Sequence, residues 1–74
     1  MARTLDCLLI GQSAKILDLR VEPNRRQRLM DLGFMAGQPV TALLRSPLGD
    51  PVAYQVLDTV IALRQSDAKQ IDIE

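Results

Sequence analysis

Histidine and tryptophan are absent from this 74-residue chain, which has a single cysteine, Cys7. Nucleophilic catalysis needs a nucleophile and a base that activates it, and iron(II) or zinc sites are mostly built from imidazole and thiolate ligands. The sequence therefore predicts a protein that is not an enzyme and that has no catalytic, metal or cofactor site, leaving room only for a weak or transient divalent metal. A lone cysteine also cannot form an internal disulfide, so nothing indicates an oxidising compartment.

Two further groups of residues contain atoms that can bind a metal. Asp67, Asp72 and Glu74 could form a weak carboxylate site near the C-terminus, but solvated charges and a helix cap explain them better. Met30 and Met35 are expected to fill gaps in the core, because thioether side chains are flexible and adaptable.

Aromatic residues are scarce, and the charges balance. Phe34 and Tyr54 are the only aromatic residues, and nine basic side chains are matched by nine acidic ones. A nucleic-acid or anionic-membrane binder needs a basic excess, and single-stranded nucleic acid and proline-rich peptides dock on aromatic side chains. The composition thus predicts no nucleic-acid partner and no direct membrane contact.

Long apolar runs are missing as well. The longest uncharged apolar stretch, residues 7–10, is too short to cross a bilayer, and the N-terminus lacks the pattern of a secretory signal. A chain of this length can form one domain with a thin core. We expect a soluble cytoplasmic protein with one domain over residues 1–74.

Alternating apolar residues and turn signals predict five short strands. We expect strands over 13–19, 39–45, 52–56, 59–64 and 71–73, a short N-terminal helix over 5–9, an inserted helix over about 25–32 and one helical turn over 67–69. The alternation fails at Ile16 and Leu17, which predicts a bulge or bend there. The pattern indicates a mainly β fold, a small five-stranded Src-homology-3-like barrel that is closed or nearly closed.

The inserted helix carries two local predictions. Asn24 followed three residues later by Gln27 matches a capping box. Leu29 and Leu32 share one face, which we expect to seat the helix on the barrel.

Two predictions concern burial elsewhere in the chain. Cys7 is expected to be a packed core thiol in the N-terminal helix, because free cysteine is so often buried. Val40, Ala42 and Leu44 are expected on one face of their strand, because side chains alternate along a strand.

Arg25, Arg26 and Arg28 crowd the first turn of the inserted helix, where the helix dipole disfavours cations. Helix stability therefore does not explain them. They form either a solvated face or a docking patch for an acidic partner surface, since arginine is enriched at interfaces. Nucleic acid is the weakest of the three readings, because the net charge is zero.

The segment from Ser46 to Pro51 is the strongest local feature. Pro47 in the second place and Gly49 in the fourth fit a type I turn, and two prolines fix the shape of the loop. The loop is either a plain hairpin connector or a shaped contact for a partner. Leu48 favours the contact, because an apolar residue at a loop tip either folds back or meets a partner.

Together these segments resemble the FeoA family, ferrous iron transport protein A, over essentially the whole chain. The matching residues are Thr4, Leu5, Leu8, Gly11, Ala14 and Ile16, then Arg25 to Leu29, Leu32, Gly33, Gly37 and Val40, then Pro47 to Pro51, and finally Leu63, Arg64, Ala68 and Ile71. The chain departs from the family at Leu9 and Ile10, where prolines are frequent, and at Asp58, where glycine is usual. Aspartate tolerates a left-handed turn, so we expect the hairpin at Asp58 to form.

The resemblance implies an Src-homology-3-like barrel that is related to the C-terminal barrel of DtxR-type iron-dependent repressors. It also implies a bacterial accessory protein that binds FeoB, the membrane GTPase that carries ferrous iron, and that meets the inner membrane only through this transporter. The alternative is a stand-alone metal-sensing or interaction domain, and the family is loosely described as binding transition metals. The residues that we expect to bind or shape the contact with a partner are Arg25, Arg26, Arg28, Leu29, Leu32, Pro47, Leu48, Gly49, Asp50 and Pro51.

Overall fold

The fold is mainly β, as the apolar alternation predicted. A computed structural model describes residues 3–74. In chain order the elements are β1 (Arg3–Thr4), the 3-10 helix η1 (Leu5–Cys7), β2 (Ser13–Leu19), α1 (Pro23–Asp31), β3 (Pro39–Arg45), β4 (Val52–Val56), β5 (Thr59–Leu63), α2 (Gln65–Ala68) and β6 (Ile71–Ile73).

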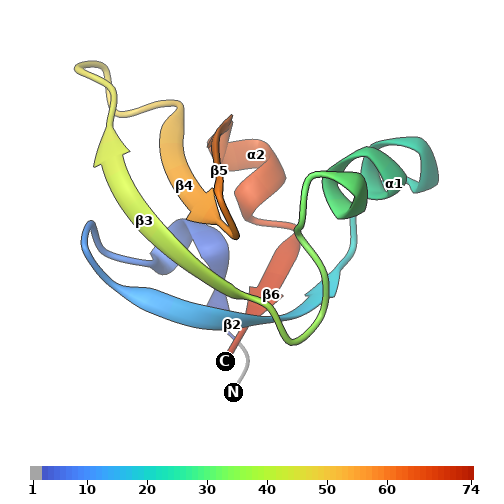
Figure 1. The fold of residues 1–74 in the computed structure, drawn as a ribbon. Helices are drawn as coiled ribbons and strands as arrows, with labels where there is room; N and C mark the ends of the chain where they lie inside the picture. The colour runs from blue at the N-terminus through green and yellow to red at the C-terminus, as the bar shows by residue number, and fades with distance from the viewer. Residues whose placement is uncertain (1–2) are drawn as a thin grey trace.

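The strands form one antiparallel sheet in the order β1-β6-β2-β3-β4-β5. Strand β2 changes partner halfway: residues 13–15 pair with β3, and residues 16–19 pair with β6. The register shifts between Ile16 and Asp18, which confirms the predicted bulge. This bend curls the sheet around its own core, with α1 standing off to one side (Figure 1).

The expected count of five strands was wrong by one. The additional strand, β1, has two residues and pairs with β6. The curled sheet also does not close, because β1 and β5 each have one strand neighbour within residues 3–74. Two residues show no alternation, so sequence reasoning could not find β1.

Aliphatic side chains fill the core around Phe34 and Tyr54, as the scarcity of aromatics predicted. The buried residues are Leu5, Leu8, Ile16, Leu19, Val21, Leu29, Phe34, Val40, Ala42, Val52, Tyr54, Val56, Leu63, Ala68, Ile71 and Ile73. Strands β2, β3, β4 and β6 and all three helices contribute buried residues, and β5 contributes its last residue, Leu63.

Helix α1 begins two residues before its predicted start, because Pro23 is pre-organised for the first helical turn. The predicted capping box is wrong: the N-cap is Glu22, which makes no side-chain cap, and Gln27 Nε2 donates to Asp31 Oδ1 at 2.9 Å. The prediction that Leu29 and Leu32 both pack the helix against the barrel is half right. Leu29 is buried, but Leu32 lies beyond the last helical residue and is 40% exposed.

Two other burial predictions were wrong. Cys7 is exposed, because the 3-10 turn is only three residues long and buries Leu5, with Leu8 following it into the core. Leu44 is 59% exposed, because the pairing of β3 with β4 shifts register after Ala42 and turns Leu44 outward.

The predicted tight turn between β4 and β5 is present. Val56 pairs with Thr59 across it, and Leu57 has a φ of 55°. The sequence predicted a left-handed conformation at Asp58, but Leu57 adopts it. Leu57 also lies against the exit of α1, since a Cβ built on Gly33 would be 3.0 Å from Leu57 Cδ1.

Candidate partner-binding site

The turn between β3 and β4 is held by its own backbone. Gly49 N donates to Ser46 O at 2.8 Å, and Ser46 N donates to Pro51 O at 3.1 Å. Arg45 Nη1 adds a long contact of 3.3 Å to Gly49 O. Leu48, at the tip, is 95% exposed. The turn thus presents one large apolar side chain on a shaped backbone.

Asp50, at the end of this turn, has a structural role. Its Oδ1 accepts a hydrogen bond from the backbone N–H of Gln65 at 2.8 Å, which satisfies a donor at the start of α2. Arg64 Nη1 lies 3.9 Å from the other carboxylate oxygen. The carboxylate of Asp50 is therefore engaged within the molecule, and Pro47 and Leu48 are the exposed residues of the predicted contact.

The three arginines of α1 differ in their surroundings. Arg25 Nη1 is 2.5 Å from Asp67 Oδ1, and this pair ties α1 to α2. Arg26 Nη2 lies 3.9 Å from Asp18 Oδ1, a distance at which the attraction is weak. Arg28 makes no side-chain hydrogen bond or ion pair with any residue of 3–74. Arg25 therefore anchors the helix, a role that the sequence did not indicate. Arg26 and Arg28 remain available to contact a partner.

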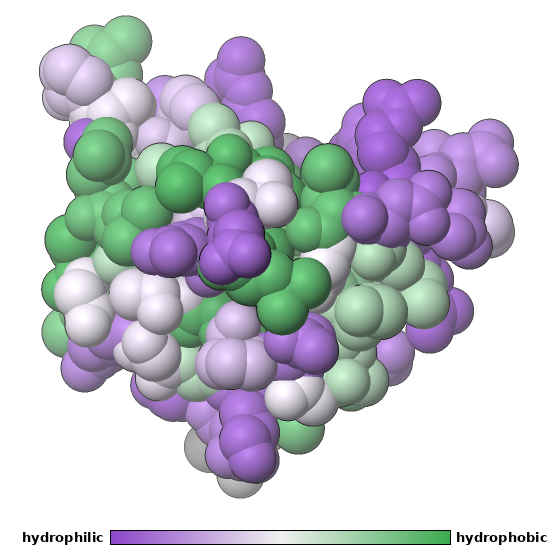
Figure 2. Space-filling view, in the orientation of Figure 1, coloured by the Kyte–Doolittle hydropathy of each residue, from purple (hydrophilic) through white to green (hydrophobic). Residues whose placement is uncertain are grey.

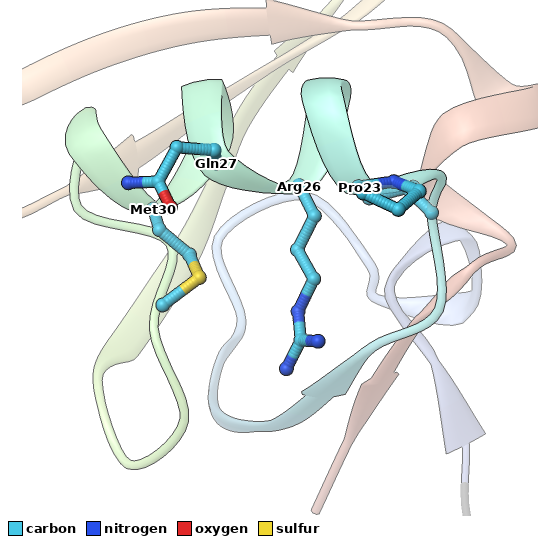
Figure 3. Close-up of a pocket in the computed structure, with 5 residues that line it drawn as sticks. Pro23, Arg26, Gln27 and Met30 are labelled. Carbon is cyan, nitrogen blue, oxygen red and sulfur yellow. The ribbon is translucent and has the colours of Figure 1, made fainter.

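A groove of about 380 Å³ lies beside α1. Its lining residues are Val21, Pro23, Arg26, Gln27 and Met30. Figure 3 shows that the side chains labelled there project from one side of the helix, with Arg26 between Pro23 and the Gln27–Met30 pair. The helical spacing of positions 23, 26, 27 and 30 could have indicated this shared face. The prediction that Met30 and Met35 fill the core was wrong, since Met30 is partly exposed in the groove and Met35 is 36% exposed.

The two predicted contact regions do not form one surface. In Figure 1 the turn between β3 and β4 and helix α1 lie at opposite ends of the view. The longest extent of the Cα trace is 30 Å. A partner that contacts both regions would have to reach across the molecule.

Two of the three acidic residues near the C-terminus, Asp67 and Asp72, form ion pairs with arginines. Arg20 donates to both carboxylate oxygens of Asp72, at 3.0 and 2.9 Å, and this hydrogen-bonded carboxylate raises the pKa of Arg20. Asp67 contacts Arg25. Within residues 3–74, no three cysteine, aspartate or glutamate side chains gather in a way that could hold a metal ion. In the same part of the chain, no helix is long and apolar enough to span a membrane.

The family model of the FeoA domain matches residues 3–74. The chain belongs to the FeoA family. A relative in Porphyromonas gingivalis, an Fe(2+) transport protein A/Fe(2+) transporter FeoB fusion protein, is 34% identical over 64 residues. This match covers 86% of the chain and 8% of the fusion protein, so the chain corresponds to a small part of that relative.

Solved FeoA structures share the fold. The solution structure of FeoA from Chlorobium tepidum has a TM-score of 0.92 and 32% identity, covering 96% of this chain and 68% of that one. The crystal structure of Stenotrophomonas maltophilia FeoA complexed with zinc, a procaryotic SH3 domain protein, has a TM-score of 0.83 and 34% identity over 99% of this chain and 91% of that one. The predicted family and the Src-homology-3-like fold are both confirmed.

The predicted kinship with repressor barrels is also confirmed at the level of the fold. A manganese-dependent transcriptional repressor has a TM-score of 0.83 over 97% of this chain and 40% of its own, at 15% identity. An identity this low carries the fold and no function. Ferrous iron transport is the process for which the P. gingivalis relative is named.

Proposed function

We propose that this FeoA protein is a non-enzymatic accessory protein of ferrous iron uptake that acts by binding a FeoB-type membrane GTPase transporter. One observation carries the proposal: in the P. gingivalis relative, a domain 34% identical to this chain is joined to the transporter FeoB in one protein. Joining two domains raises the effective concentration of each for the other, which is useful when they must contact each other. Such a contact requires a binding surface on this domain.

Exposed residues with no close internal partner supply that surface. Leu48 is an apolar anchor on a preformed turn, and a preformed loop loses little entropy on docking. Arg26 lines the groove of α1, and Arg28 lies elsewhere on the same helix; both present positive charge, which suits an acidic patch on the transporter. With these contacts, the protein would lie in the cytoplasm and approach the inner membrane only through the transporter.

Calorimetric titration of the protein with the soluble GTPase domain of the transporter, and then with the full-length transporter, tests the proposal. We expect saturable binding that is weakened by Leu48→Ser or by Arg28→Glu. Lys15→Glu is the matched control for the charge, because it makes the same change at an exposed position on β2. Its affinity for the transporter should stay within about twofold of the wild type, since a charge that lies away from the interface contributes little to binding.

Two results would contradict this account. If neither the soluble domain nor the full-length transporter binds, the adaptor function is wrong. If binding is present but Arg28→Glu and Lys15→Glu weaken it equally, net charge drives the association and α1 is not the site. The alternative of a metal-sensing domain is supported by the likeness in fold to a repressor and by the zinc complex of the S. maltophilia relative, and we do not propose it.

A further inference from the structure

The two ends of the sheet differ in how well they are protected against pairing. Strand β1 has two residues, one of them the charged Arg3. Strand β5, Thr59–Leu63, has five residues with no charge and no proline, and it pairs with β4 in one regular register. Natural edge strands are usually short, charged, bulged or covered. By these criteria β5 is an unprotected edge.

The free backbone groups of β5 belong to Val60 and Ala62. The two-residue turn closes with the pair Val56 and Thr59, so Thr59, Ile61 and Leu63 direct their N–H and C=O groups toward β4. The alternate residues, Val60 and Ala62, direct theirs away from the sheet. No other backbone hydrogen bond within residues 3–74 uses them, and both side chains are exposed.

The surroundings of β5 are apolar and accessible. Strand β5 lies near the viewer and is seen along its edge in Figure 1. In the same orientation, Figure 2 shows hydrophobic residues gathered at the centre and left of the molecule, while the region over α1 is mostly hydrophilic. Val60 and Leu44, each 59% exposed, contribute to the apolar surface of the sheet.

We propose that β5 pairs antiparallel with β5 of a second copy of this chain, about a two-fold axis at Ile61. In this register Val60 lies opposite Ala62 of the second copy, and Ala62 lies opposite its Val60. Because both residues direct their backbone groups outward, each pair forms two hydrogen bonds, four in all. The result is a sheet that continues from one copy to the other through the two β5 strands, so that β5 is no longer an edge in either copy.

The charges beside the strand select the second copy as occupant and fix the register. Pairing about Ile61 places Asp58 opposite Arg64 of the second copy at both ends of the new ladder. Asp58 forms no ion pair within residues 3–74, and the Arg64 side chain is 71% exposed, with Asp50 3.9 Å away. A shift of two residues would place Asp58 opposite Ala62 or Ser66 and lose both ion pairs. The edge is thus complementary to itself in one register.

Charge reversal tests this register directly. Sedimentation equilibrium, from about 10 μM to about 1 mM, covers the affinities expected of a small interface. We expect wild-type protein to dimerise with rising concentration, with Val60 and Ala62 amides gaining protection from hydrogen exchange. Asp58→Arg and Arg64→Asp each create two like-charge pairs, so each should weaken dimerisation about tenfold or more. An equimolar mixture of the two variants restores both opposite-charge pairs and should associate as the wild type does.

Further variants distinguish pairing through the β5 edge from an effect of net charge on dimerisation. Lys15→Asp and Asp31→Arg change the net charge by the same amounts away from β5, and each should dimerise as the wild type does. Ala62→Pro removes one outward N–H while leaving the ladder with β4, and it should abolish dimerisation with the circular dichroism spectrum unchanged. The proposal is wrong if the wild type stays monomeric to 1 mM, if the variant mixture gains nothing, or if Ala62→Pro still dimerises.

Discussion

Helix α1 and the turn between β3 and β4 are both exposed, but they are stabilised in different ways. The turn is fixed by three hydrogen bonds among residues 45–51, and its apolar tip, Leu48, is almost fully exposed. Helix α1 has one buried residue, Leu29, and one close ion pair, Arg25 with Asp67, to hold it against the rest of the molecule.

Within each region, some residues stabilise the fold and others are left free to contact a partner. In α1 the same short segment contains an anchor, Leu29, a tie to α2, Arg25, and the unpaired Arg28. In the turn, Asp50 caps α2, and Leu48 has no internal role. A residue type or a run of charges therefore does not identify a binding surface; the residues left without internal partners do.

The largest expected difference in stability comes from making the same leucine-to-alanine change once in α1 and once in the turn. Leu29→Ala removes the buried anchor of α1 and should lower the free energy of unfolding by about 2–4 kcal/mol. Leu48→Ala should change it by less than about 0.5 kcal/mol, because the side chain is exposed, and should instead weaken transporter binding. Urea denaturation and the binding titration measure the two effects. A large loss of stability with Leu48→Ala would show that the tip packs on the barrel.

The exit of α1 gives the next largest effect. Gly33 has a φ of 115°, and a Cβ there would press on Leu57 at 3.0 Å, so Gly33→Ala should lower the free energy of unfolding by about 1–2 kcal/mol. Gly37→Ala is the matched control, because Gly37 has a φ of 90° but nothing within 4 Å. Equal losses in the two variants would mean that the contact between α1 and the β4–β5 turn is unimportant.

A smaller effect distinguishes the arginines of α1. Arg25→Gln removes the ion pair with Asp67, whose side chain is 18% exposed, and should lower the free energy of unfolding by about 0.5–1 kcal/mol. Arg28→Gln should leave it unchanged and weaken transporter binding. The loss with Arg25→Gln should shrink in high salt, because salt screens exposed charges. If Arg28→Gln is the more destabilising variant, the assignment of roles within α1 is reversed.

The last prediction has no effect at neutral pH. Burial raises the pKa of Tyr54, with a smaller contribution from Asp6. The unfolded chain then loses this proton first, so the free energy of unfolding should fall as the pH rises above about 10, the ordinary value. Below that pH the contribution is fully present. Tyr54→Phe should remove this part of the fall.

Absorbance of the phenolate reads the Tyr54 pKa alone, since the chain has one tyrosine and no tryptophan. A titration midpoint in the folded protein at or below that of free tyrosine would contradict the buried position of this side chain of β4.

Local pattern was sufficient for most of the fold. The bounds of β2 and β3 match their predicted ranges, because seven residues provide enough alternation to be recognised. Sequence reasoning failed where local rules compete. Pro23 begins α1 before the expected capping box at Asn24, and a register shift in β3 turns Leu44 outward against the alternation.

The candidate site was less predictable, because its parts depend on distant residues. Arg25 meets Asp67 across 42 positions of the chain, and Asp50 meets Gln65 across 15. Nothing in the sequence near Arg25 indicates that its charge is used while that of Arg28 is free. The self-complementary edge of β5, by contrast, could have been found from Asp58, the uncharged strand and Arg64 alone.

The central claim is that this protein acts through the surface it presents to FeoB. The most direct measurement is an NMR titration of the ¹⁵N-labelled protein with the unlabelled GTPase domain of the transporter, repeated with the full-length transporter. We predict saturable changes at the amides of Ser46, Leu48 and Gly49 and at those of Arg26 and Arg28 in α1. Spectra that stay unchanged with both forms of the transporter would contradict the claim.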